Sequence, residues 1–538
     1  MRLAVTTLVA VLFAFDAAAR TSDAYRVTVG EGDAARALPV HLALTPDGAG
    51  NWFKLPPEVF RVYDGIDHAT VGKQTFFTSF DSDAAETKVT VRPARPFKAF
   101  RIKPAAYGIP AERRGDDLVL SVPKGRKIVV ELDGDTSGQL SIFSNAPAGA
   151  PTEAKRTIRF APGLHTAAND ARIRPDEYGN PVLQGLADDT VVSLDEGAVV
   201  EAAVVIAGLK NVRIEGRGMF SLLERCEGAD RGFRGKLWGG FRRWALPSVY
   251  IRSGSRGVTI DGVTFVSEFR GIVARNSDDI VIRNVKNFTY TANGDGINCV
   301  NCSNVLVDDC YLRNGDDNVC MYTSYDSIPT LNDVGYAPHA PVSENYEIRN
   351  CVLWVNCRPF QIAGHGTGSS EPHDRVANIR VHDCEIVDVA FNVFGNTRKH
   401  DEFWSGALRI LSQGEARVSD VRFERINVDL TAGYTGKPIH VETRDSGKRS
   451  YSEKRGYRIE NVVFRDVAFS HVATNAVPSF LVGGHDADSG DDYGIFGVTF
   501  DNVTLDGRPL TPDDLTVRGR VREVRRHYQI LGRANSFR

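Results

Sequence analysis

A short strand-forming unit that recurs along the chain limits most strongly what this sequence can fold into. The unit reads apolar, any residue, apolar, polar, then Gly, Asn or Asp, then apolar. Its copies begin at Val212, Val258, Ile280, Val305, Tyr346, Ile379, Val421, Tyr457 and Val498. The tightest spacings between starts are 22 residues (280 − 258) and 25 residues (305 − 280). Such a repeat, with no helical period between its strands, predicts an all-β solenoid, the parallel β-helix.

Equivalent residues of successive coils stack on one another in a β-helix, so each repeat position forms a column. One position holds Cys310, Cys351 and Cys384, which predicts an internal stack of thiols that pack as small apolar groups. A second position holds asparagines that can hydrogen-bond from coil to coil, namely Asn284, Asn350, Asn461 and Asn502.

The chain divides at a change of pattern near residue 150. Residues 20–145 contain short alternating strands separated by turn signals, for example Asp117–Val122 and Lys127–Leu132. This alternation predicts a small β-sandwich. Residues 146–155 are rich in Ala, Pro and Gly and are expected to form a linker. The β-helix is expected over 156–510, followed by a C-terminal tail at 511–538.

The first residues have the pattern of a secretory signal peptide. Arg2 gives a positive start, Leu3–Phe15 is apolar, and small residues near Ala19 offer a cleavage site. We therefore expect a signal peptide at 1–19 and a secreted or periplasmic protein. No later segment reaches the length of about 18 apolar residues needed to cross a bilayer, so membrane insertion is not expected.

The net charge and the cysteine content limit which partners and cofactors we expect. The net charge is −3, which predicts no bulk attraction to nucleic acid. The eight cysteines permit disulfides in an exported protein. Cys299 and Cys302 have the spacing of half a zinc site, but no second pair completes it, so neither a metal nor another cofactor is expected. We expect a monomer whose partner is a polysaccharide or oligosaccharide.

Two acidic clusters follow strands in neighbouring repeats. Asp295 lies in Asn-Gly-Asp-Gly and the Asp316–Asp317 pair in Gly-Asp-Asp, 21 residues later (316 − 295). This separation is close to one coil, so the three carboxylates are expected on one outer face. One crowded carboxyl could hold a proton while the others orient water, as hydrolysis of a glycosidic bond requires. Alternatively, both clusters could simply form turns.

Two later segments add candidate site residues. His365 stands between Gly364 and Gly366, and the bare glycines favour an exposed imidazole over a packed one. Arg409 interrupts an apolar strand, Ala407–Leu411, where an outward guanidinium could hold a carboxylate or a sugar hydroxyl. A structural histidine and a surface salt bridge are the plain alternatives.

With these motifs in this order, the region Gly163–Ser470 resembles glycoside hydrolase family 28, the polygalacturonases and their relatives. The resemblance implies a right-handed parallel β-helix whose cleft is surrounded by the motifs. It also implies that Asp316 protonates the leaving oxygen. Asp295 and Asp317 would activate water with inversion at the anomeric carbon.

The remaining roles also come from this resemblance. His365 would orient the acid, and Asn293 would support the first aspartate. Arg409, together with Gly364 and Gly366, would contact substrate.

One departure from the family pattern leaves the sugar open. The last motif of the family ends in a lysine that contacts a uronate carboxylate, whereas this chain has Leu411. The order of a sandwich before a β-helix also resembles glycoside hydrolase family 49, the dextranases and isopullulanases, which act on neutral α-glucans. The Gly-His-Gly motif and the spacing of the aspartates resemble family 28 more closely.

An insertion at Arg231–Trp244 mixes cations with aromatic side chains. Trp238 could stack on a sugar ring and Arg243 could pair with a uronate carboxylate. A surface loop that covers the flank of the solenoid is the alternative.

These residues together favour an exported, pectinase-like hydrolase with an inverting three-aspartate mechanism. A polysaccharide lyase and a non-catalytic glycan-binding β-helix are the alternatives on the same fold.

Overall fold

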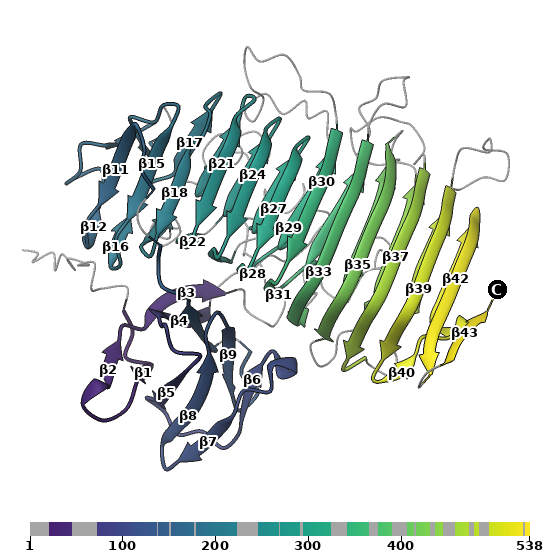
Figure 1. The fold of residues 1–538 in the computed structure, drawn as a ribbon, viewed down its shortest axis with the longest axis horizontal. Helices are drawn as coiled ribbons and strands as arrows, with labels where there is room; N and C mark the ends of the chain where they lie inside the picture. The colour runs from purple at the N-terminus through teal and green to yellow at the C-terminus, as the bar shows by residue number, and fades with distance from the viewer. Residues whose placement is uncertain are drawn as a thin grey trace, which may run out of the picture.

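A β-sandwich and a long β-solenoid make up the chain, as the computed structural model shows (Figure 1). The structure describes residues 21–45, 73–136, 138–149, 152–176, 179–222, 246–267, 269–290, 294–323, 342–364, 375–389, 406–413, 416–430, 436–444, 458–472, 478–483, 494–530 and 533–537. Within these ranges no helix is long and apolar enough to cross a membrane. The all-β class, with a parallel β-helix behind a sandwich, is confirmed.

The sandwich consists of two five-stranded sheets that enclose one apolar core. The first sheet has the order β2(Arg36–Leu38), β1(Tyr25–Val29), β5(Glu86–Pro93), β8(Asp117–Pro123) and β7(Ala111–Arg114). The second has the order β3(His41–Thr45), β4(Lys73–Asp81), β10(Leu140–Asn145), β9(Lys127–Leu132) and β6(Phe100–Lys103). Strict alternation of buried and half-exposed residues along β8 shows why it forms a strand with one face on the core.

One wall of the solenoid is a ten-stranded parallel sheet. It is called the site sheet hereafter, because the acidic residues lie in turns that lead into its strands. Its strands are β17(Val204–Ala207), β20(Val249–Arg252), β23(Ile272–Arg275), β26(Ile297–Val300), β29(Val319–Thr323), β32(Phe360–Gly364), β34(Leu408–Gln413), β36(Ile439–Arg444), β38(Ser479–Gly483) and β41(Leu515–Gly519).

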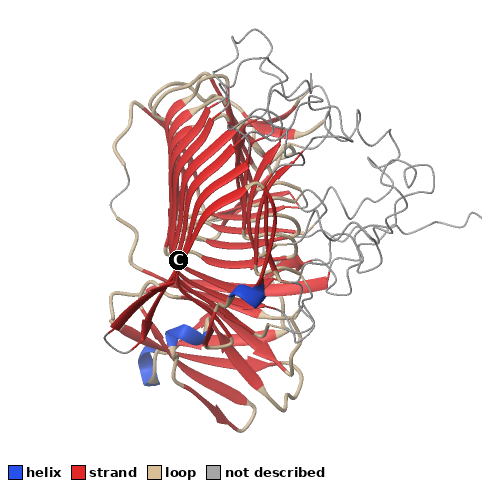
Figure 2. Cartoon of the chain, turned by 90° about the vertical axis from the view of Figure 1, so that its right-hand side faces the viewer, coloured by secondary structure: helices blue, strands red, loops and turns tan. Residues whose placement is uncertain are grey.

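The other walls belong to a single 21-stranded sheet that bends between two rows of strands. The first row contains β11(Arg156–Phe160), β15(Thr190–Leu194), β18(Arg213–Gly216), β21(Arg256–Asp261), β24(Asp278–Arg283), β27(Ser303–Asp308) and β30(Val342–Arg349). The second row contains β12(Gly163–His165), β16(Ala198–Val200), β19(Met219–Leu222), β22(Thr264–Ser267), β25(Lys286–Thr289), β28(Tyr311–Asn314) and β31(Val352–Val355). In later coils the rows merge into β33(Arg375–Val389), β35(Arg417–Leu430), β37(Arg458–Ser470) and β39(Gly494–Leu505). Figure 2 views the solenoid nearly along its long axis.

Short elements complete the described part of the chain. They are the strands β13(Ile173–Pro175), β14(Pro181–Leu183) and β40(Arg508–Pro509), and the 3₁₀ helices η2(Gly32–Ala34), η4(Ala105–Tyr107) and η5(Pro512–Asp514).

Identical positions stack from coil to coil, and the core shows this directly. Phe464 lies between Phe423 and Phe500, with ring centroids 5.2 and 5.4 Å apart. Cys310, Cys351 and Cys384 are fully buried in one column, as predicted, and the seven cysteines of the described residues are free thiols. Burial raises the pKa of Cys351 well above its ordinary value, so its thiol stays uncharged and packs as a small apolar group.

The corners of each coil depend on residues with positive φ, a conformation that asparagine tolerates. Asn350 (φ 56°) and Asn502 (φ 56°) lie at the corner between the two rows, as the repeat predicts. Asn461, assigned by the pattern to that column, lies instead at the corner before the first row, where its side chain donates to Asp420 at 3.2 Å. Both corners use the same residue type, so the letters alone did not distinguish them.

The segment 511–538 was expected to form a tail, but its described residues, 511–530 and 533–537, include strands that continue the solenoid. They contain β41, β42(Val521–Ile530) and β43(Arg533–Phe537). β41 pairs with β38 of the site sheet, and β42 pairs in parallel with β39. The last coil is therefore closed by residues beyond 510.

The sandwich packs against the outer face of the second row (Figures 1 and 2). Phe288 of β25 stacks on Phe77 of the sandwich with ring centroids 4.8 Å apart, and Tyr311 of β28 lies 4.9 Å from Phe143. Buried polar groups cross the same interface. The ammonium of Lys286 donates to the Asn145 side chain at 2.7 Å.

We expect Phe288→Ala to lower the free energy of unfolding by about 3–5 kcal/mol, because it opens a cavity between two tightly packed bodies. Urea denaturation followed by tryptophan fluorescence measures the loss. Val517→Ala serves as the control, since Val517 is 50% exposed and its truncation should leave the midpoint unchanged. Equal midpoints for the two variants would show that the sandwich contributes no packing energy to the solenoid.

Candidate active site

The acidic residues lie in the turns that connect the second row to the site sheet. Asp295 precedes β26 by two residues, and Asp317 precedes β29 by two residues. The ladder between these strands continues into the turns, where the amide N of Gly296 donates to the carbonyl oxygen of Asp317 at 2.8 Å. Asp295 and Asp317 therefore occupy the same position of consecutive coils, whereas the 21-residue count in the sequence had paired Asp295 with Asp316.

Two arginines occupy this position in the coils on either side. The amide N of Gly271 donates to the Asp295 carbonyl oxygen at 3.0 Å, which places Arg270 beside Asp295. The amide N of Asn318 donates to the Arg358 carbonyl oxygen at 2.9 Å, which places Arg358 beside Asp317. Four successive coils thus form a column of cation, anion, anion and cation.

Asp295 is buried and held from two sides. The Nε of Arg270 lies 3.2 Å from its Oδ2, and the side-chain amide of Asn298 donates to the same oxygen at 2.5 Å. Burial raises the pKa of the Asp295 carboxyl. Arg270 opposes this rise, whereas the charge of Asp317 adds to it.

Asp317 is gripped by Arg358 in a two-point contact. The Nε of Arg358 donates to Oδ1 at 2.7 Å and its Nη2 donates to Oδ2 at 2.9 Å. The backbone N of Arg358 adds a third bond to Oδ1 at 3.1 Å. Because both partners are about 5% exposed, this pair is shielded from water and its geometry is fixed.

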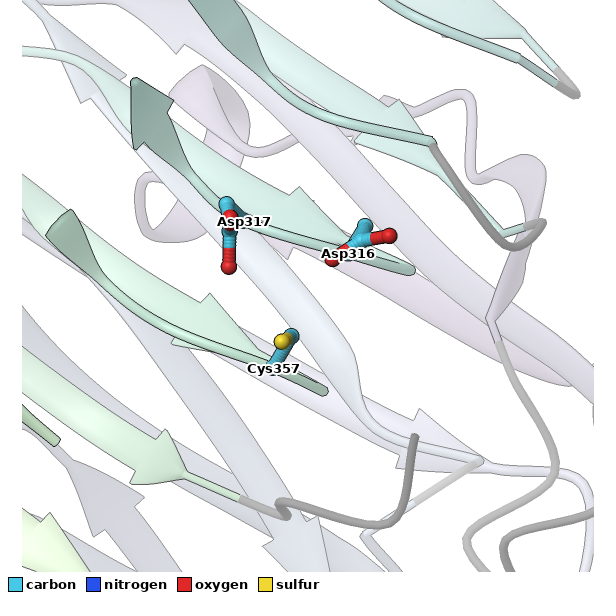
Figure 3. A group of neighbouring side chains, drawn as sticks. All are labelled: Asp316, Asp317 and Cys357. Atoms are coloured by element: carbon cyan, nitrogen blue, oxygen red, sulfur yellow. The ribbon is translucent and has the colours of Figure 1, made fainter. Parts of the chain in front are cut away.

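Asp316 is half-buried and lies on the same turn as Asp317, directly before it in the chain (Figure 3). Its backbone N donates to the Gly294 carbonyl oxygen at 3.3 Å. One ligand atom from each of Asp316, Asp317 and Cys357 lies within 4.8 Å of the others, near enough in principle for a metal ion. Since Arg358 already binds both oxygens of Asp317, we interpret this group as an acid pair beside a thiol.

Side-chain amides under the turns fix these positions. The Asn318 amide donates to the Asn314 Oδ1 at 2.8 Å and to the Trp354 carbonyl oxygen at 3.0 Å. The Asn314 amide donates to the Thr289 hydroxyl at 2.9 Å, and that hydroxyl donates to the Gly294 carbonyl oxygen. All three side chains are fully buried, so the turns rest on a continuous polar network.

The glycine after Asp295 is required by close packing. A Cβ on Gly296 would lie 2.3 Å from the Asn314 Oδ1 and 2.6 Å from the Asn318 carbonyl oxygen. The second glycine of Asn-Gly-Asp-Gly therefore has a steric reason, beyond any preference for turns.

Arg409 lies on the site sheet two strands beyond β29. Its neighbours Leu408 and Ile410 belong to the core, so its side chain lies on the outer face, as predicted. It is 1% exposed, and its Nη1 is 3.5 Å from the Gln361 Oε1. His440 occupies the same position in the next coil, and Leu411 lies beside Glu442.

Gly364 is the described residue of the Gly-His-Gly motif, and it does not lie in the acidic column. Gly364 ends β32, whereas the residue that precedes β32 at the level of Asp317 is Arg358. Asn293, His365, Gly366, Trp238 and Arg243 lie outside the described residues.

Arg270, Arg358 and Asn318 were not identified from the sequence. Counting along the column would have found both arginines, since Arg270 precedes Asp295 by 25 residues and Arg358 follows Asp317 by 41.

Carboxylates grouped along the outer edge of a parallel β-helix define a glycoside hydrolase that acts on O-glycosyl bonds. The model of glycosyl hydrolases family 28 matches residues 204–513, more than half of the 538 residues, and the chain belongs to this family.

Solved structures of other proteins are similar to this chain at low sequence identity. Dex49A from Penicillium minioluteum is 15% identical, with 92% of this chain and 90% of that chain covered and a TM-score of 0.55. A family 28 exopolygalacturonase from Yersinia enterocolitica is 12% identical, with coverage of 83% and 97% and a TM-score of 0.43. An exopolygalacturonase from Thermotoga maritima is 13% identical, with coverage of 71% and 92% and a TM-score of 0.43. No curated protein matches the chain in sequence.

We expect Asn318→Ala to reduce hydrolytic activity by about 10–100-fold, because the turn that carries Asp316 and Asp317 loses its amide anchor. Initial rates of reducing-end release measure the effect. The matched control is Asn304→Gly, which removes an exposed asparagine of the coil corner and keeps its positive φ of 59°. A wild-type rate in Asn318→Ala would mean that the amide network does not set the geometry of the site.

Proposed function

We propose that the protein hydrolyses a pectin-type polysaccharide by an inverting mechanism. Asp316 donates a proton to the leaving glycosidic oxygen, while Asp295 and Asp317 accept a proton from the water that attacks the anomeric carbon. The observation that carries this proposal is the stacking of Asp295 on Asp317, with Asp316 on the same turn. An inverting enzyme of this kind keeps its acid and base carboxyls roughly 6.5–9.5 Å apart to admit the water.

The charge of the site sheet supports an anionic sugar. Arg252 on β20 and Arg275 on β23 follow core residues of their strands and lie on the outer face before the aspartates. Arg409 and Arg518 lie on the outer face in later coils. Arg275 and Arg409 are 6% and 1% exposed, so Arg252 and Arg518 are the more accessible of the four. Guanidinium groups bind planar carboxylates with two hydrogen bonds, so an accessible arginine on this face suits a polymer that carries uronates.

A neutral α-glucan is the second candidate, and it rests on Leu411. This buried side chain stands where the family pattern has a uronate-binding lysine. The likeness to Dex49A concerns the fold and does not bear on the sugar.

Replacing the proposed acid gives the first test. Asp316→Asn keeps the shape of the side chain but removes its proton, so we expect turnover to fall by about 10³-fold or more, with thermal unfolding unchanged. Asp279→Asn is the control, because Asp279 is an exposed corner residue at φ 58° that asparagine can replace. Near-normal turnover in Asp316→Asn would remove this residue from the role of acid.

Products identify both the substrate and the stereochemistry. Purified enzyme is incubated with polygalacturonate, rhamnogalacturonan, dextran and pullulan, and reducing ends are counted. We expect cleavage of an acidic polymer, with the first product detected by proton NMR in the inverted anomeric configuration. Cleavage of dextran or pullulan alone would favour the neutral glucan. An unsaturated product absorbing in the near ultraviolet would indicate a lyase.

Export is part of the proposal and rests on the apolar segment Leu3–Phe15. A secreted or periplasmic monomer would meet polymeric substrate outside the cytoplasm.

A further inference from the structure

The acidic column presents an electrostatic problem. Asp295 and Asp317 stack on adjacent coils, which are about 4.8 Å apart. Two carboxylates at that distance in a buried site repel each other, and such a pair ordinarily keeps one shared proton. The mechanism proposed above uses both as bases and therefore needs both ionised.

The ends of the column offer a solution. Arg270 lies against the outer side of Asp295, and Arg358 lies against the outer side of Asp317. Each arginine contacts one carboxylate directly and lies in line with the second carboxylate one coil further on.

We propose that Arg270 and Arg358 are positioning residues which, by enclosing Asp295 and Asp317 from both ends of the column, keep the two carboxylates ionised together. This inference rests on the proposed function, since it explains how two stacked bases can be ionised at once. Arg358 also sets the orientation of Asp317 through its two-point contact.

Among the described residues, the other titratable groups found to act on this cluster are acidic or neutral. They are Asp316, Cys320, Tyr322 and Cys357. Burial raises the pKa of Cys320, Tyr322 and Cys357, so these three remain neutral at acidic and neutral pH. Burial raises the pKa of Asp295, while Arg270, the Asn298 amide and Arg358 lower it.

The direction of the pH effect follows from these contacts. A base works in its ionised form, so activity falls as the pH drops through its pKa. Removing Arg270 or Arg358 raises the pKa of Asp295 further, because each guanidinium now lowers it. The acidic limb of the activity profile should therefore move to higher pH.

The test compares kcat/KM against pH on polygalacturonate for wild type, Arg270→Gln and Arg358→Gln. We expect the acidic limb to move up by about one pH unit or more in each glutamine variant. Arg270→Lys and Arg358→Lys keep the charge, so their limbs should stay near the wild-type position even if kcat falls. Titration of the substrate is common to all variants and cancels in the comparison.

Arg349→Gln is the matched control, since Arg349 bridges to Asp308 at 3.1 Å on the coil of Arg358 but outside the acidic column. Its limb should not move. Unshifted limbs in both glutamine variants would overturn the proposal. If the glutamine variants do not fold, the lysine variants decide, because a shift of a full unit despite the retained charge contradicts a charge effect.

A second arm does not depend on activity and separates this inference from the proposed function. Arg358→Gln leaves Asp317 as a buried, uncompensated charge, so the melting temperature at pH 7 should fall sharply. In the Asp317→Asn background the same substitution should cost far less. Equal losses of melting temperature in both backgrounds would refute the charge compensation, and a smaller loss in the Asp317→Asn background would support it. Either result holds even if the protein cleaves none of the four polymers.

Discussion

Stacking of equivalent residues at the spacing of one coil is the constraint on which the rest of this structure depends. It forms the cysteine column and the phenylalanine stack without cost, because apolar groups attract at that distance. Applied to charges, the same spacing is unfavourable. Two like charges about 4.8 Å apart repel by about 3 kcal/mol at an effective dielectric constant of about 20. Arg270 and Arg358 stack at the two ends of the acidic column, and we propose that their positive charges compensate this repulsion.

The features that the sequence predicted well are those that depend on short, uninterrupted coils. The coil between Asp295 and the Asp316–Asp317 pair is uninterrupted, so counting brought the two acidic clusters together, although it paired Asp295 with Asp316 and the strand ladder pairs it with Asp317. Arg358 lies one coil beyond Asp317 but 41 residues later, because a long insertion stretches that coil. Counting by the tight spacing of 22–25 residues misses Arg358, whereas counting by the 41 residues between the repeat starts Val305 and Tyr346 reaches it.

Motif letters proved weaker evidence than repeat position. Gly364 belongs to a Gly-His-Gly motif in the expected order, yet it is the last residue of β32, whereas the acidic column lies in the turns before the strands. Asn461 likewise matches the repeated unit and lies at the other corner. In a solenoid the side of a strand on which a residue falls decides what it can contact, and a short string of letters does not record that side. Contacts with the sandwich were beyond prediction for another reason, since they join residues more than a hundred positions apart.

Those contacts make the sandwich part of the frame of the site. Arg313 of β28 donates to the Thr136 carbonyl oxygen at 2.7 Å and lies 4.2 Å over the ring of Trp354. Burial lowers the pKa of Arg313, because desolvation penalises its charged form. The next residue, Asn314, joins the amide network beneath the acidic turn. Since a fully buried cation tolerates little displacement of its partners, the sandwich fixes the end of β28. Gly315 alone separates Asn314 from Asp316, so this constraint extends to Asp316.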